Sequence, residues 1–116
     1  MRTLPHNHGQ EIEKHFEHMP KEESFHVVAD VFKLLSDSNR VRIFWMLCHC
    51  EECVINISAL MEMSSPAVSH HLRLLKDNGL ITSRRDGKEV YYKAAETEQA
   101  EMLHQAIEKM ARITCI

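Results

Sequence analysis

Three cysteines crowd into the six residues from Cys48 to Cys53, which read CHCEEC. Their C-x-C-x2-C spacing would let a helix end unwind and fold several sulfurs around one ion. Thiolate sulfur favours soft or borderline ions such as Zn(II), Cd(II), Pb(II), Cu(I) or trivalent arsenic over hard cations. We therefore predict a thiolate-bound metal ion (Cd, Pb or Zn, with As(III) as a further candidate) at Cys48, Cys50 and Cys53. The alternative is that Cys48 belongs to the core of its helix and only the other two thiols are available.

Histidines supply a second set of potential ligands, since the chain holds nine of them. Residues 1–20 have no apolar periodicity before Ile12, so we predict a His-rich flexible N-terminal arm, with a single domain over residues 21–116. A short helix over residues 10–17 would place His15 and His18 on one face at i, i+3 spacing. The alternative is an arm whose histidines are incidental. The secondary ligand candidates are His15, His18, His49 and Cys115.

A helix with a polar outer face is predicted downstream of these thiols, from Ser65 up to Asn78. Ser64 suits the N-cap, Pro66 is tolerated in the first turn, and Asn78-Gly79 is typical of a helix end. Helical spacing gives an inward stripe of Val68, Leu72 and Leu75, and an outward set of Ser65, Ser69, His70 and Arg73. Such outward side chains suit base edges and phosphates, although an ordinary amphipathic surface helix would look the same.

A charged hairpin follows the polar helix. Residues 81–85 and 89–93 flank Asp86-Gly87, a two-residue turn signal, and basic side chains gather beside the turn. With a shorter helix within residues 56–63, these elements form a helix-turn-helix followed by a wing. The predicted DNA-contacting residues are Ser64, Ser65, Ala67, Ser69, His70, His71, Arg73, Arg84, Arg85 and Lys88.

Charge supports this interpretation once it is divided along the chain. The net charge is −3, yet residues 65–93 contain six Lys and Arg against three Asp and Glu. A basic segment in an acidic chain predicts nucleic acid on one face. No apolar run approaches the ~18 residues of a membrane span, and no signal-peptide pattern is present, so we expect a soluble, cytoplasmic protein. No nucleophile with a base at motif spacing and no phosphate loop is found, so no enzyme is predicted.

Further helices must carry these sites. A helix over residues 22–35 is predicted with Phe25, Val28, Phe32 and Leu35 as a buried stripe, and another over residues 40–48. The last helix, residues 96–114, has apolar positions at alternating spacings of three and four, which predicts a face that meets a second copy of the chain. The predicted dimer residues are Ala100, Leu103, Ile107, Met110 and Thr114. The expected fold is mainly α with a small β-hairpin, in the order α-α-α-α-β-β-α, as a homodimer through the terminal helices.

The runs FKLLSDSNRVRIFWMLC and ECVINISALMEMSSPAVSHHLRLLKDNGLITSRRDGKEVYY resemble the ArsR/SmtB family of winged-helix, metal-sensing repressors. The resemblance covers about residues 27–112 without needing a gap. It implies a homodimer whose paired helices enter successive major grooves of a palindromic DNA operator. It also implies an inducer that weakens DNA binding.

The chain departs from that family at its ligand positions. Cys53 falls where metal-sensing relatives carry the first Cys of E-L-C-V-C-D-L, but the second Cys is Ile55 here and the acidic residue is Asn56. Two of the four zinc-ligand positions on the last helix are Lys109 and Arg112. The resemblance therefore implies neither usual ligand set in full.

Two other functions stay open. A thiol-redox or reactive-sulfur-responsive repressor of the same fold could pair Cys48 or Cys50 with Cys53 or Cys115, although Trp45 stands where such relatives carry their cysteine on the second helix. A metal-buffering protein that does not bind DNA is the alternative of another class. Binding to random duplex at varied salt would separate that class from the repressors.

Overall fold

The computed structural model describes residues 4–114, which divide into two compact units on either side of the Phe32–Lys33 bond. The first unit contains α1 (Ile12–Glu17) and most of α2 (Glu22–Leu34). The predicted buried stripe is wrong for three of its four residues in the single chain: Phe25, Val28 and Phe32 are 45%, 48% and 72% exposed, whereas Leu35 packs against the core of the second unit. A short pair of helices has no core of its own, so the apolar side of α2 cannot be buried within this unit.

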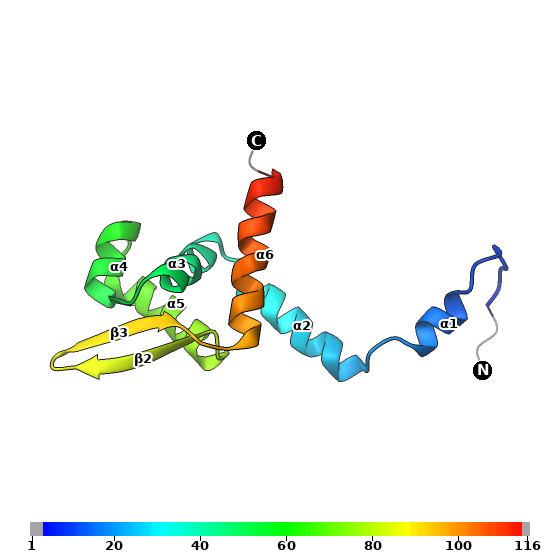
Figure 1. Ribbon diagram of the computed structural model, residues 1–116, viewed down its shortest axis with the longest axis horizontal. Helices are drawn as coiled ribbons and strands as arrows, with labels where there is room; N and C mark the ends of the chain where they lie inside the picture. The colour runs from blue at the N-terminus through cyan, green and yellow to red at the C-terminus, as the bar shows by residue number, and fades with distance from the viewer. Residues whose placement is uncertain (1–3, 115–116) are drawn as a thin grey trace. The chain divides into compact units, whose positions relative to one another are not determined.

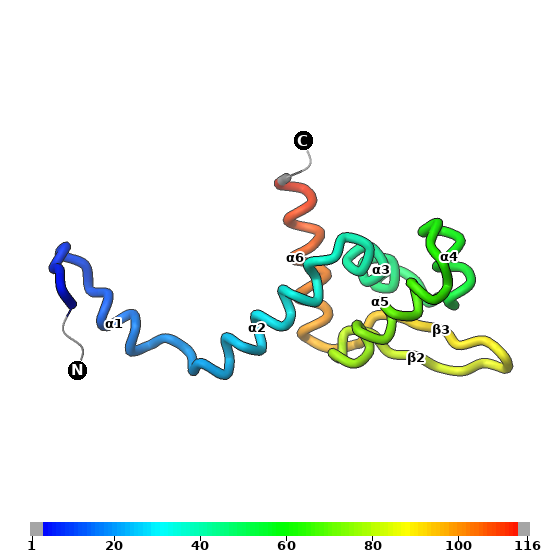
Figure 2. The backbone as a smooth tube through the Cα atoms, turned by 180° about the vertical axis from the view of Figure 1, so that it is seen from behind, coloured from blue at the N-terminus to red at the C-terminus, as the bar shows by residue number. Residues whose placement is uncertain are grey.

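The second unit contains the remaining elements, which Figure 1 shows as helices on one side of a long hairpin. They are α3 (Ser38–His49), β1 (Glu52–Cys53), α4 (Val54–Met61), α5 (Ser65–Asp77), β2 (Ile81–Asp86), β3 (Glu89–Ala94) and α6 (Glu98–Thr114). Figures 1 and 2 show the hairpin turn projecting beyond the neighbouring helices, with α6 at the opposite end of the unit. This confirms the predicted winged helix-turn-helix class.

The core of the second unit fixes α5 against the other helices. Ile43 and Phe44 of α3, Ile57 of α4 and Val68 of α5 are each 0% exposed. Burying a side chain of this size contributes roughly 1.5–3 kcal/mol relative to leaving it in water. The opposite face of α5 is therefore held at a defined angle to the rest of the unit.

Local signals set the ends of α5 as predicted. The Ser64 side chain accepts a hydrogen bond from the backbone amide of Ala67 at 3.3 Å, and Asn78 closes the helix. Gly79 follows at φ +76°, a conformation that glycine adopts without steric cost. The turn between α4 and α5 uses Glu62 at φ 54°. The turn between α4 and α5 is therefore short, with Glu62 at the end of α4 and Ser64 at the start of α5.

A third strand, which the sequence did not predict, joins the hairpin. The sheet is antiparallel with the order β1-β3-β2, and Glu52 and Cys53 pair with Tyr92 and Tyr91. The segment that carries the cysteines is thus hydrogen-bonded to the wing. Within residues 4–114, no helix has the length and apolar character needed to cross a membrane.

Candidate functional site

The outer face of α5 presents the polar side chains expected of it. Ser65, Ser69, His70 and Arg73 are exposed, while Val68, Leu72 and Leu75 are buried. Arg73 Nη2 lies 3.0 Å from His70 Nδ1, so the guanidinium and the imidazole form one polar cluster. The predicted contact residues Ser64 and Ala67 lie at the start of the helix, exposed and half-buried respectively. This face can donate and accept hydrogen bonds and carries a cation.

His71 is placed differently from the rest of the predicted DNA-contacting set. It is only 9% exposed, and Arg40 Nη1 donates to its Nδ1 at 3.2 Å. Arg40 Nε also donates to the carbonyl of Leu34 at 2.6 Å, so the guanidinium connects α2, α3 and α5. Burial lowers the pKa of His71, with the positive charge of Arg40 acting in the same direction. This placement favours a neutral ring in a packed contact.

The burial of His71 predicts that the protein loses stability in acid. Because the folded-state pKa lies below the unfolded value of 6.5, the unfolded chain binds the proton first as the pH falls. The contribution is fully present above pH about 6.5 and declines below it. Urea denaturation followed by circular dichroism between pH 5 and 8 should give a smaller pH slope for His71→Gln than for the wild type. His70→Gln, at an exposed neighbour, should stay closer to the wild-type slope than His71→Gln does; equal slopes for all three proteins would contradict this.

The wing holds two kinds of basic side chain. Arg84 is engaged: its Nε and Nη2 donate to the Glu51 carboxylate at 2.6–3.0 Å, and its guanidinium lies 4.9 Å from the Tyr91 ring centroid. The hydrogen bonds from Arg84 lower the pKa of Glu51. Arg85 and Lys88 are exposed near the turn, where they can reach a phosphate backbone.

The three predicted thiol ligands occupy three different environments. Cys48 is half-buried in α3, and burial, with the charges of Glu101 and Glu108, raises the pKa of its thiol to about 11. Cys50 is exposed at the C-cap of α3 and donates to the Met46 carbonyl at 3.3 Å. Cys53 is 9% exposed in β1. Within the described part of the chain, the three sulfurs do not form a group of ligand atoms close enough together to hold one metal ion.

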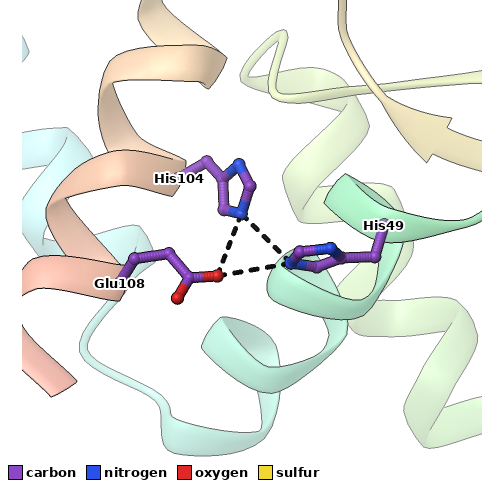
Figure 3. Close-up of side chains that lie close together, drawn as sticks. All are labelled: His49, His104 and Glu108. Carbon is purple, nitrogen blue, oxygen red and sulfur yellow. Dashed lines mark hydrogen bonds and ion pairs between the residues drawn. The ribbon is translucent and has the colours of Figure 1, made fainter. Parts of the chain in front are cut away.

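A different set of side chains does converge. Within residues 4–114, His49, His104 and Glu108 form the group whose ligand atoms all lie within 4.8 Å of one another. Figure 3 shows the two rings and the carboxylate pointing toward one another, His49 from the end of α3 and the other two from α6. Sequence reasoning named His49 as a secondary candidate and missed His104 and Glu108. Their i, i+4 spacing was the one available signal.

A groove opens beside this cluster. It has a volume of about 600 Å³ and runs between the end of α3 and the start of α6. Cys48, Cys50, His49 and His104 all contribute to its lining. Potential sulfur and nitrogen ligands therefore share one solvent-accessible hollow.

The predicted dimer residues divide into two groups. Ala100 is 1% exposed, and Leu103 and Ile107 pack against the core of their own unit. Met110 is 62% exposed, and the side chain of Thr114 lies outside the described residues. The N-terminal part of the apolar stripe of α6 thus packs against its own unit, whereas Met110, nearer the C-terminus of α6, is exposed. Of the secondary ligands, His15 and His18 are exposed in the first unit, and Cys115 lies outside the described residues.

Comparisons with known proteins agree with this architecture. The sequence profile described as "Bacterial regulatory protein, arsR family" matches residues 37–83, which run from α3 into β2. The crystal structure of a possible transcriptional regulatory protein (fragment 1–100) from Mycobacterium bovis is 30% identical, with a TM-score of 0.67, and the match covers 80% of this chain and 99% of that one. The chain belongs to the arsR family of bacterial regulatory proteins. The profile describes members of this family as bacterial regulatory proteins.

The names of other relatives indicate what those proteins respond to or bind. A "Cadmium resistance transcriptional regulatory protein CadC homolog" of Staphylococcus aureus is 41% identical over 80 residues, covering 68% of this chain and 66% of its own length. An "Arsenical resistance operon repressor" of the same species is 36% identical, covering 60% and 66%. The solution structure of the Mycobacterium bovis domain, a homodimeric winged helix-turn-helix DNA-binding domain, has a TM-score of 0.71 at 27% identity and covers 84% and 92%. The chain thus spans slightly less than two thirds of the two Staphylococcus aureus relatives it matches.

Proposed function

We propose that this arsR-family protein is a repressor that binds duplex DNA through α5 and the β2–β3 wing. The observation that carries the proposal is the exposed polar face of α5 beside the exposed cations of the wing. Hydroxyl, imidazole and guanidinium groups on α5 suit the major groove, and Arg85 and Lys88 suit phosphates. The projecting hairpin extends the basic surface beyond the helices (Figure 1).

The proposed assembly is a homodimer on a palindromic operator. The exposed apolar side chains of α2 and of the C-terminal part of α6 support it, because a second copy could cover them: Phe32 is 72%, Met110 62% and Ile113 66% exposed. The Mycobacterium bovis relative is named as a homodimer. A two-fold dimer would set two copies of α5 about one DNA turn apart, as a palindrome requires.

The proposed inducer is a soft metal ion (Cd, Pb or Zn, with As(III) possible) held by thiolates of Cys48, Cys50 and Cys53. The chemistry of the donor set fits such an ion, and two relatives are named for cadmium and arsenical resistance. The separate placement of the three sulfurs means that the segment from Cys48 to Cys53 has to rearrange before all of them can share one ion. An ion bound there would compensate the negative charges of the three thiolates and would hold the segment in its rearranged conformation.

That rearrangement would reach the wing directly. Glu51 lies inside the moving segment and holds Arg84 of β2 through hydrogen bonds of 2.6–3.0 Å. Cys53 itself pairs with Tyr91 of β3. A change in the backbone between Cys50 and Cys53 therefore alters both of these contacts with the wing. We propose that this is how the thiol segment controls the angle of the wing on DNA.

Binding to duplex DNA at varied salt tests the proposed function. A repressor that uses phosphate contacts should lose affinity linearly in log salt, with a slope of about −0.9 for each phosphate neutralised. For a dimer that uses Arg73, Arg85 and Lys88 from each copy, we expect a slope of about −5 in filter binding. Failure to bind any duplex at low salt would overturn the proposal in favour of a protein that only holds metal.

A further inference from the structure

We propose that His49, His104 and Glu108 form a second metal site, separate from the thiols, for a divalent transition-metal ion such as Zn(II). This site joins the end of α3 to the middle of α6 within one chain. It is independent of the proposed DNA binding, because it rests on the geometry of three side chains alone.

The distances between the three ligand atoms match those around a metal ion. His49 Nε2 and His104 Nε2 lie 3.2 Å apart, and each lies 3.3 Å from Glu108 Oε1. A tetrahedral Zn(II) ion with bonds of about 2.0–2.1 Å separates its ligands by about 3.3–3.4 Å. An ion placed slightly above this triangle would thus reach all three atoms at bonding distance with little movement of the side chains.

Hydrogen bonding alone serves this triangle poorly. A neutral imidazole has one N–H, and an ionised carboxylate has no proton to donate. The two rings therefore offer at most two N–H groups for three close contacts: His49–His104, His49–Glu108 and His104–Glu108. A metal cation, in contrast, would accept a lone pair from each of the two imidazole nitrogens and from the carboxylate oxygen. The arrangement is therefore better suited to a cation than to a closed network of hydrogen bonds.

The helices hold the ligands in place. His104 and Glu108 are four residues apart, so both project from one face of α6, and their neighbour Ile107 packs against the core. Leu47, 2% exposed, anchors the last turn of α3 just before His49. The two imidazole rings meet edge to face, at 87° with centroids 4.8 Å apart. The site thus stands on two packed helices.

Trp45 contacts two of the three proposed ligands. Its Nε1–H donates to Glu108 Oε1 at 2.9 Å, and its ring lies 4.3 Å from the His49 ring. A residue that orients a ligand in this way typically affects metal affinity about 10–100-fold. Trp45 is therefore a positioning residue for the proposed site.

The donor set and exposure select the kind of ion. Two imidazole nitrogens and one carboxylate oxygen suit Zn(II), Co(II) or Ni(II) better than Mg(II) or Ca(II), which prefer oxygen alone. The His104 side chain is 20% exposed and that of His49 is 45% exposed, so an ion can enter from solvent. Three protein ligands would leave the fourth position of a tetrahedral ion for water.

Zinc titration of the reduced full-length chain, followed by the imidazole proton signals of each histidine, tests this site. We expect the His49 and His104 signals to shift together and the fluorescence of Trp45, the single tryptophan, to change over the same zinc range. Co(II) at this site should give visible d–d bands that persist in the Cys48→Ser/Cys50→Ser/Cys53→Ser variant. His104→Gln and Glu108→Gln should each abolish the shift of His49, and Trp45→Phe should weaken binding on the order of tenfold.

Matched variants separate this site from the other histidines and thiols. His70→Gln on α5 and Glu101→Gln on α6 should leave the zinc response of His49 unchanged, and thermal melting should show that every variant is folded. Zinc shifts confined to the histidines of residues 1–20 would overturn the proposal. So would a His49 response that survives His104→Gln in a folded protein, or one that disappears with the cysteines.

Discussion

The double variant Arg85→Ala/Lys88→Ala is expected to bind duplex DNA about 10–100-fold more weakly than the wild type at moderate salt. Both side chains are exposed beside the wing turn, where a phosphate can approach them from solvent. Because each copy of a dimer would then neutralise two fewer phosphates, the slope of log affinity against log salt should become shallower by about 3–4. Fluorescence anisotropy with a labelled duplex at several salt concentrations measures both quantities.

The control for that variant removes the same charge elsewhere. Lys14→Ala/Lys21→Ala removes the same charge from the first unit and should keep the wild-type slope, because neither side chain belongs to the proposed phosphate contacts. An equal loss of affinity in both double variants would show that net charge, and not binding by the wing, determines affinity. Arg84→Ala should change the salt slope less than Arg85→Ala/Lys88→Ala does, since the Glu51 carboxylate already neutralises the Arg84 guanidinium.

Elements with short-range signals were predictable from the sequence. The cap at Ser64 and the stop at Asn78-Gly79 are found where expected. The hairpin turn lies one residue later than the predicted Asp86-Gly87, at residues 87–88, because Asp86 still pairs with Glu89. Such signals act through local backbone preferences, so a neighbouring domain or a partner does not change them. This is why α5 and the wing could be outlined before any tertiary contact was known.

His71 shows how residue type can conceal a buried position. It lies three residues after Val68 and four before Leu75, so helical geometry alone places it on the inward stripe. Its polar ring suggested a base contact, but Arg40, thirty-one positions earlier, supplies a partner that allows burial. A sequence pattern cannot reveal such a partner.

Long-range pairs account for most of what the sequence could not show. The Glu51–Arg84 ion pair joins residues 33 apart, and the contact between His49 and Glu108 joins residues 59 apart. A two-residue strand such as β1 is too short to carry a periodic pattern. These contacts follow from the packing of α3 against β3 and α6, which depends on the whole core.

Cadmium is expected to weaken operator binding of the wild-type protein by about 5–150-fold, the usual range for coupling between two sites, and Cys53→Ser should abolish this response. Cys53 is the critical thiol because it lies in β1, paired with Tyr91 of the wing. Its substitution removes a soft ligand and changes little else, so DNA binding without metal should stay within a few-fold of the wild type. Anisotropy titrations with and without cadmium measure the response.

Two further variants identify the path of that response. Cys115→Ser removes a thiol outside the Cys48–Cys53 segment and should respond to cadmium as the wild type does. Glu51→Gln keeps all the cysteines but weakens the hold on Arg84, so it should bind cadmium with unchanged thiolate absorbance while its DNA affinity responds less. A Cys53→Ser protein that still releases DNA with cadmium would remove the thiol segment as the sensor. A full response in Glu51→Gln would instead show that the signal bypasses the Glu51–Arg84 pair, because the ion would then be bound and sensed without it.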